Sequence, residues 1–198
     1  MKEYKTEKLI ADYLDQDKID QYLDMVITAN AKFNLFSRNL DKPALLTMVA
    51  ESMIPLDLGW IGGKSNPVLD IGSGWGIPSF PLLVSGKVKD VTFLERASKK
   101  SDLLSLMLSK MELKARIVNV DLAEFAPKSE YKTITMRQVS IDSKIVGELR
   151  RIAGDDCRLI YFGPGLPDGL FDKTDMEEYS IDDSDPRRIF RAPIAQKK

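Results

Sequence analysis

Residues 66–81, which read NPVLDIGSGWGIPSFP, constrain the fold more than any other stretch of the chain. Residues 68–71 have the apolar character of a strand buried on both faces, and residues 72–76 form a glycine-rich segment directly after it. Glycine permits positive φ and lets a ligand approach the backbone without a Cβ in the way, and Pro78 suits the first turn of a following helix. We therefore predict a strand, a tight turn and a helix N-terminus that can receive a nucleotide-like ligand.

Two classes of cofactor use such a turn. The dinucleotide fingerprint needs a glycine at its sixth position, and counting from Gly72 that position is Ile77. NAD(P) and FAD are therefore disfavoured. A G-x-G-x-G turn after an acidic residue, here Asp70, is the pattern of class I S-adenosylmethionine (SAM) methyltransferases. SAM is the predicted cofactor, and a dinucleotide or a purely structural turn are the alternatives.

Strand and helix patterns alternate after the turn. The strands that we predict end near Ile71, Glu95, Asp121, Arg137 and Phe162. This alternation indicates right-handed crossovers and a mostly parallel sheet that is covered on both faces. The predicted fold class is α/β, a Rossmann-like class I SAM-methyltransferase sheet. Because ligands bind beyond the carboxyl ends of such strands, we expect residues 72–76 and the polar strand ends to converge there.

At 198 residues the chain fits a single domain. Residues 1–58 show helical periodicity and are predicted to form an N-terminal helical cap on a core of residues 66–198, with one helix around residues 19–27 and a second from about Asp41 to before Pro55. Residues 178–181 and 188–191 are predicted to form a closing antiparallel pair, with acidic residues before the turn and basic residues after it. A solvated hairpin and a frayed tail that contains Lys197 and Lys198 are the simplest interpretation.

Composition narrows the function classes. The formal net charge is −1, so nucleic acid would have to be bound by local cationic patches. The absence of histidine and the single cysteine, Cys157, exclude histidine-based triads and argue against zinc, so no metal is predicted. The N-terminus lacks the apolar core of a signal peptide, and no segment has the length of a membrane span. We therefore expect a cytoplasmic protein without a membrane partner.

Two acidic strand ends suit an adenosine. Glu95 is expected to accept hydrogen bonds from the ribose hydroxyls, although an acid at a strand end can also be merely solvated. Asp121 is placed to meet the adenine amino group, with the backbone of Leu122 and Ala123 beside the ring. Lys99 and Lys100 open the helix after Glu95, where cations oppose the helix dipole, and they are predicted to bind the substrate. Candidates to widen this patch are Lys110, Lys114, Arg116, Arg187, Arg188 and Arg191, although solvation on a helix face is the commoner explanation for any single lysine.

Five segments together resemble a known family. They are LDIGSGWGIPSFPL, FLERASKKSDLL, VNVDLAEF, TITMRQVS and KFNLFSRN. Their order and spacing are similar to those of the RsmG (GidB) methyltransferases, which transfer a methyl group from SAM to N7 of a guanine in bacterial small-subunit ribosomal RNA. The resemblance runs from about Tyr22 to Phe162 and implies ribosomal RNA or the small ribosomal subunit as the partner.

The resemblance also implies roles for single residues. It assigns SAM binding to Gly72, Ile77, Leu122 and Ala123, and makes Arg137 the functional arginine, which we predict to be catalytic as well. With the residues of the turn and the strand ends, the predicted SAM site comprises Asp70, Gly72, Ser73, Gly74, Gly76, Ile77, Glu95, Asp121, Leu122, Ala123 and Arg137. Where family members carry an Arg-His pair before an Asp-Ser, this chain has Thr47 and Met48 before Glu51 and Ser52. The adenine loop has Asp121 in place of an arginine, and Gln138 replaces a small residue.

Other acceptors remain open at this stage. Guanine N7 offers a free lone pair, so attack on a methyl group requires no base, whereas a hydroxyl acceptor would need Asp, Glu, Lys or Tyr as the base. A methyltransferase for a small molecule or a protein, and a SAM-binding module without catalysis, are the two alternatives. The sequence does not specify an oligomeric state.

Overall fold

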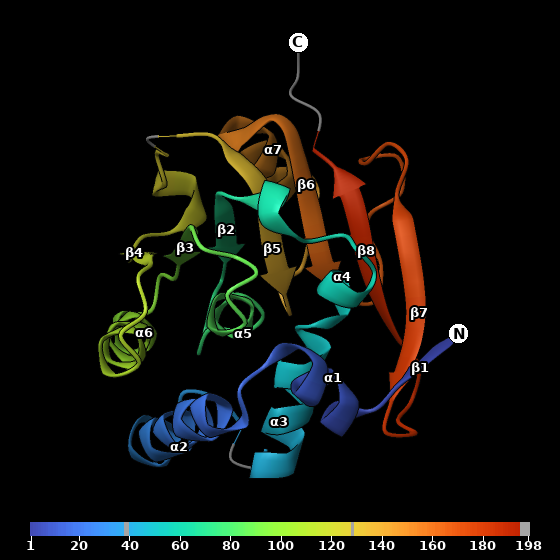
Figure 1. The fold of residues 1–198 in the computed structure, drawn as a ribbon. Coiled ribbons are helices and arrows are strands. Elements are labelled where there is room, and N and C mark those ends of the chain that lie inside the picture. The colour runs from blue at the N-terminus through green and yellow to red at the C-terminus, as the bar shows by residue number, and fades with distance from the viewer. Residues whose placement is uncertain (38–39, 128, 195–198) are drawn as a thin grey trace.

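The computed structural model describes residues 1–37, 40–127 and 129–194. One eight-stranded sheet, with the order β1-β7-β8-β6-β5-β2-β3-β4, runs through the molecule (Figure 1). The strands are β1 (Lys2–Tyr4), β2 (Val68–Ile71), β3 (Val91–Leu94), β4 (Arg116–Val118), β5 (Tyr131–Arg137), β6 (Ala153–Phe162), β7 (Asp175–Ile181) and β8 (Arg187–Pro193). The helices are α1 (Thr6–Tyr13), α2 (Gln16–Phe33), α3 (Lys42–Glu51), α4 (Ile54–Asp57), α5 (Ser79–Val84), α6 (Ser98–Lys110) and α7 (Ser143–Ile152), with 3₁₀ turns η1 (Gly63–Ser65) and η2 (Leu122–Glu124).

Successive residues of β6 show that both faces of the sheet are covered. Ile160 and Phe162 belong to a large apolar cluster that includes residues of α2, α3, α5 and α6, whereas Leu159 and Tyr161 belong to a second cluster with residues of α7. Side chains alternate between the faces of a strand, so each face buries its own core. This arrangement confirms the predicted α/β fold class.

The five strands β4, β3, β2, β5 and β6 are parallel and therefore end at one edge. The register pairs Ile71 of β2 with Leu94 of β3 and with Met136 of β5, so these three strands end level with one another. Gly72 and Glu95, which follow β2 and β3, and Arg137, the last residue of β5, lie at the same edge. Figure 1 shows α2, α3, α5 and α6 near this carboxyl edge of the sheet.

The C-terminal antiparallel pair is also confirmed. Strand β8 runs antiparallel to both β6 and β7, and the acidic strand β7 is paired with the basic strand β8. Arg188 bonds Glu178 at 3.2 Å and Arg191 bonds Asp175 at 2.6 Å across the pair. The segregated charges therefore neutralise each other across two strands. Lys197 and Lys198 lie outside the described residues.

Two local predictions were wrong. Residues 2–4 form a strand, β1, which pairs in parallel with β7, so the N-terminal region adds to the sheet as well as capping it. Three residues are too short to show a period of two, and this strand owes its existence to its partner. The third core strand, β4, ends at Val118 rather than near Asp121. The N-cap of α6 is Ala97, which makes no side-chain capping bond, and the Ser98 hydroxyl donates to Asn119 Oδ1 at 3.0 Å.

The starts of three helices follow directly from sequence signals. Asp15, Asp41 and Asp142 each accept a hydrogen bond from a backbone amide three residues later, at 2.8–3.1 Å. An aspartate at this position satisfies one of the free amides of the first helical turn. Among the residues that the structure describes, no helix is both long and apolar enough to cross a membrane.

Candidate functional site

The three glycines after β2 serve two different purposes. All have positive φ, of 69° at Gly72, 57° at Gly74 and 108° at Gly76. A Cβ on Gly74 would meet only the Gly72 carbonyl oxygen, at 3.9 Å, whereas a Cβ on Gly76 would lie 2.6 Å from Cβ of Phe80. Gly72 is exposed and Gly74 is partly exposed, so the first two glycines leave backbone open to a ligand and the third lets α5 pack closely.

An aromatic stack supports the turn from the N-terminal helices. Tyr22 of α2 stacks on Phe80 with ring centroids 4.6 Å apart and on Trp75 at 5.9 Å. The Tyr22 hydroxyl donates to the carbonyl oxygen of Trp75 at 2.9 Å. The cap region is thus tied to the backbone of the turn itself. Ile77 is buried in the same apolar cluster, so its side chain takes part in packing.

Glu95, directly after β3, holds the turn from the other side. Its Oε2 accepts a hydrogen bond from the Gly74 amide and its Oε1 from the Ala97 amide, each at 2.8 Å. The side chain is nearly buried, and it links the turn to the start of α6. A carboxylate offers about four acceptor sites, so two remain for a ligand at this edge.

Asp70 and Ser73 lie beneath the turn. Asp70 Oδ1 accepts from the Thr135 hydroxyl at 2.6 Å, and the Ser73 hydroxyl donates to the Asp70 carbonyl at 2.9 Å. Burial raises the pKa of the Asp70 carboxyl to about 7. Its Oδ2 has no hydrogen-bond partner within the described part of the chain. These two residues support the turn from inside the sheet.

The predicted adenine loop follows β4. Asp121 Oδ1 accepts from the Ala123 amide at 3.1 Å and thereby caps η2, and Arg96 lies 3.6 Å from its Oδ2. Leu122 is buried, and Ala123 is exposed. The Asp121 carboxylate is therefore engaged by its own loop, and its contact with an adenine amino group stays a prediction.

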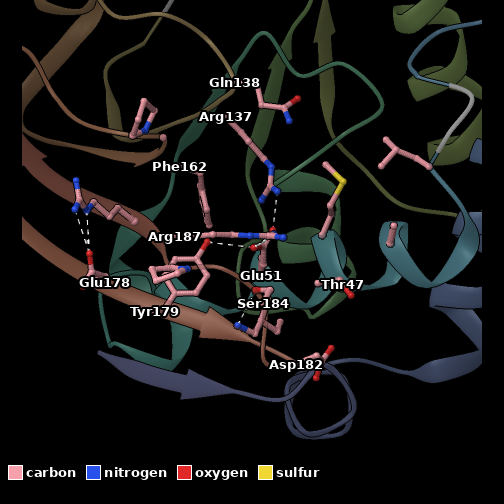
Figure 2. A pocket seen from close by; sticks show the side chains of 18 residues that line it. Thr47, Glu51, Arg137, Gln138, Phe162, Glu178, Tyr179, Asp182, Ser184 and Arg187 are labelled. Atoms are coloured by element: carbon pink, nitrogen blue, oxygen red, sulfur yellow. Dashed lines mark hydrogen bonds and ion pairs between the residues drawn. The ribbon is translucent and has the colours of Figure 1, made fainter.

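A pocket of about 810 Å³ opens beyond the ends of β5 and β6. Of its lining residues, Arg137 alone was predicted for the SAM site, whereas Arg187 and Arg188 were predicted to extend the cationic patch. Figure 2 shows side chains from α3, from the ends of β5 and β6 and from the β7–β8 hairpin around this pocket. Its lining includes Thr47, Met48, Glu51, Arg137, Gln138, Phe162, Tyr179, Asp182, Ser184, Arg187 and Arg188.

Glu51 of α3 is the centre of this pocket. The carboxylate is fully buried and accepts from Arg137 Nη2 at 2.6 Å, from Arg187 Nη1 and from the Tyr179 hydroxyl at 3.4 Å (Figure 2). Burial, and then the charge of Glu51, raise the pKa of Tyr179, so this hydroxyl keeps its proton. Arg137 also lies over the ring of Phe162, 5.5 Å from its centroid. The sequence marks Glu51 as part of a departure from the family pattern and Arg187 as a member of the cationic patch. No spacing rule links residues so far apart in the chain, so their bond to each other was not predicted.

The pocket adjoins the glycine turn. Because Ile71 pairs with Met136, the next residues, Gly72 and Arg137, are neighbours at the ends of adjacent strands. A Cβ on Gly72 would lie 2.9 Å from Cγ2 of Val139, in the loop that follows Arg137. The structure thus brings Gly72, Gly74, Glu95 and Arg137 to one edge, as predicted. A ligand bound at the glycine turn can therefore lie beside a ligand bound in the pocket.

Lys99 and Lys100 are in the first turn of α6, near this edge. The Nζ of Lys99 lies 5.8 Å from the ring centroid of Phe33, a residue 44% exposed, and Lys32 lies over the same ring at 5.1 Å. Lys110, Lys114 and Arg116 do not extend this patch. They lie at the far end of α6 and at the start of β4, towards the opposite edge of the sheet.

A parallel sheet whose first core strand leads into a G-x-G-x-G turn, with an acidic residue after the next strand bonded to that turn, defines a class I SAM-dependent methyltransferase. The family model described as GidB, rRNA small subunit methyltransferase G, matches residues 15–158. The chain belongs to this family.

Individual relatives and solved structures agree with this placement. The chain is 28% identical over 186 residues to the ribosomal RNA small subunit methyltransferase G of Borrelia hermsii, covering 87% of each protein. It is 27% identical over 150 residues to the protein of that name from Brachyspira hyodysenteriae, covering 74% of this chain and 70% of the relative. The fold is similar to that of M. jannaschii TYW2 in complex with AdoMet, with a TM-score of 0.54, 12% identity and 74% of each chain covered.

Proposed function

We propose that this protein transfers a methyl group from SAM to N7 of a guanine in small-subunit ribosomal RNA. The observation that carries the proposal is the family match over residues 15–158, which spans the glycine turn, Glu95 and Arg137. A second support is the open backbone at Gly74, where a nucleotide-like ligand can approach the turn.

The residues at the turn fit SAM. The space beside Gly74 is open where a Cβ would stand, and Glu95 directs a carboxylate with free acceptor sites at the same edge. We assign the ribose hydroxyls to Glu95, the adenine to the loop of Asp121, Leu122 and Ala123, and backbone contacts to Gly72 and Gly74. When bound, SAM supplies a methyl group on a sulfonium. Four buried residues maintain the shape of the turn that binds SAM, because they pack beneath it. They are Asp70, Ser73, Gly76 and Ile77.

The acceptor guanine is assigned to the pocket beside Arg137. Its volume of about 810 Å³ accommodates a nucleotide, and it opens one strand away from Gly72. Guanine N7 already carries a lone pair, so the protein has no proton to remove. Its task is to align the acceptor with the methyl group, and good alignment contributes up to roughly 7–11 kcal/mol in favourable cases. Arg137 is the residue placed to position both reactants, and a chain without histidine is suited to this chemistry.

The RNA is assigned to the face around Lys99, Lys100 and Phe33. Lysine ammonium groups beside an exposed aromatic ring are the combination that holds phosphates and stacks on unpaired bases. The partner on this proposal is ribosomal RNA, as the free molecule or within the small subunit.

The test is methylation of small-subunit ribosomal RNA with labelled SAM, in naked RNA and in assembled subunits that lack the modification. We expect label at one guanine, with chain cleavage at that base after reduction and aniline treatment, which detects N7 methylation. Glu95→Ala should abolish most of the signal, and Glu7→Ala, at an exposed position in the first turn of α1, serves as the matched control. If the protein binds SAM but labels neither form of the RNA, a small-molecule or protein acceptor replaces this proposal.

A further inference from the structure

The pocket floor carries two guanidinium groups and one carboxylate. Glu51 is fully buried and bonds Arg137 and Arg187 at once, and Tyr179, a neutral group, supplies its third donor. One positive charge at this floor is therefore left without a matching negative charge. Because the Arg187 side chain is 41% exposed and lines the pocket, this excess charge can be reached by a ligand, and it favours an anion.

The other charges that line the pocket do not cancel this excess. Arg188 is paired with Glu178 at 3.2 Å, so that pair is neutral. Asp182 is exposed at the rim, where its Oδ1 accepts from the Thr6 amide at 3.0 Å. Water screens an exposed carboxylate far more than it screens the charges around buried Glu51. Figure 2 shows Asp182 near the edge of the group, with Arg137, Glu51 and Arg187 at its centre.

Donors remain available for an anion. Within the described residues, Arg137 Nε and Nη1 are buried and have no hydrogen-bond partner. The Arg137 side chain is 11% exposed and is fixed by Glu51 and Phe162, whereas that of Arg187 is 41% exposed and faces the pocket. A guanidinium offers five N–H donors in a planar fork that matches the oxygens of a phosphate. Glu51 therefore holds two arginines in place. The unused donors of Arg187 are on a partly exposed side chain that lines the pocket, whereas Nε and Nη1 of Arg137 are buried.

We infer that Arg137 and Arg187, held by Glu51, form a phosphate-binding subsite for the acceptor nucleotide. This inference rests on the proposed function, because it places the nucleotide in this pocket. Glu51 is a positioning residue here, and Arg187 is the residue that contacts the anion from the solvent side. A phosphate on these groups would fix the nucleotide one strand away from the glycine turn.

The experiment is calorimetric titration of the folded full chain with guanosine 5′-monophosphate, with guanosine and inorganic phosphate as separate ligands. We expect the monophosphate to bind at least tenfold more tightly than guanosine. Arg187→Gln should remove most of that difference. Glu51→Gln, which keeps the shape and removes the opposing charge, should strengthen phosphate binding severalfold. Arg188→Gln is the matched control and should change the affinity for the monophosphate less than twofold, because Arg188 is already neutralised by Glu178.

A phosphate subsite predicts that Arg187→Gln weakens phosphate binding and that Glu51→Gln strengthens it. If the cluster were only structural, both substitutions would weaken phosphate binding. Equal affinity of the wild type and Arg187→Gln for the monophosphate, with circular dichroism showing both folded, overturns the inference. SAM is titrated in parallel. If Arg187→Gln weakens SAM as much as the nucleotide, the anion is the cofactor carboxylate and the phosphate assignment is wrong. If phosphate binding behaves as expected while ribosomal RNA is not methylated, the subsite stands and the proposed function fails.

Discussion

The glycine turn and the arginine pocket lie side by side at one edge of the sheet, but they are built in different ways. The turn is made of consecutive residues, and its geometry resides in positive φ values at Gly72, Gly74 and Gly76. The pocket depends on Glu51, which meets Arg137 from 86 positions away and Arg187 from 136 positions away. A local motif specifies the first region, whereas only the folded chain assembles the second.

Four of the residues that mark departures from the family pattern lie in the second region, whereas one, Asp121, lies in the adenine loop on the cofactor side. Thr47, Met48, Glu51 and Gln138 all line the pocket, while the G-x-G-x-G turn and Glu95 follow the pattern. A cofactor that is the same in every relative requires the same turn, and an acceptor pocket has more freedom to change its side chains. The predictions below test whether the two regions are as separate as this comparison implies.

The largest effect is expected at Asp70, which would show that the turn also depends on a buried side chain. Its folded pKa, about 7, is above the ordinary value of 3.8, so the folded protein holds a proton that the unfolded chain releases. The resulting stability is present below pH 4 and is lost as pH rises through 7, by up to about 4 kcal/mol. Asp70→Asn should flatten this loss, as measured by urea unfolding at pH 5 and pH 8. Parallel pH slopes for the two proteins would contradict it.

The second prediction concerns Gly76, where the turn meets α5. Gly76→Ala should lower the free energy of unfolding by about 2 to 4 kcal/mol, because its Cβ would overlap Phe80 and its φ is unfavourable for alanine. Gly86→Ala is the control, since Gly86 also has positive φ, at 69°, but open space around it. We expect about 1 kcal/mol there. Equal losses in thermal and urea unfolding would mean that close packing at Gly76 contributes nothing.

The turn and the pocket show which parts of the structure can be predicted from the sequence and which cannot. The order of strands and helices, the turn and the pairing of residues 178–181 with 188–191 were predicted, because periodicity, glycine and aspartate act over a few residues. Strand β1 and the cluster around Glu51 were missed, because both depend on partners distant in the chain. The convergence of Gly72, Glu95 and Arg137 was predictable from the parallel sheet alone. The bonds that Glu95 and Asp121 make with backbone amides were not, since they depend on exact loop paths.

The third prediction tests the cofactor side by itself. Glu95→Gln should weaken SAM binding by about 1.5 to 3 kcal/mol, because a charged acceptor for the ribose and for the Gly74 and Ala97 amides is lost. Calorimetry gives the affinity directly. Glu7→Gln, at an exposed position on α1, should bind SAM like the wild type. Unchanged affinity in Glu95→Gln would remove this residue from the cofactor site.

The smallest effect is expected on the RNA face. Lys99→Glu should weaken RNA binding and reduce the slope of log affinity against log salt by about one, with SAM affinity unchanged. Lys110→Glu, an identical change at the other end of α6, should leave the slope as it is. Filter binding across a salt series provides the comparison. If both variants lose the same slope, the RNA covers the whole helix rather than its first turn.

The aromatic stack beneath the turn has an optical consequence. The chain has two tryptophans, and Trp75 lies within the turn, with its carbonyl bonded to Tyr22 and its ring stacked on it. The other, Trp60, lies under Arg191 at 5.4 Å. A Trp60→Phe variant would therefore leave a single indole emitter at the centre of the cofactor region. Its fluorescence would report occupancy of the turn without any label, and stopped-flow mixing would time the arrival of each ligand separately.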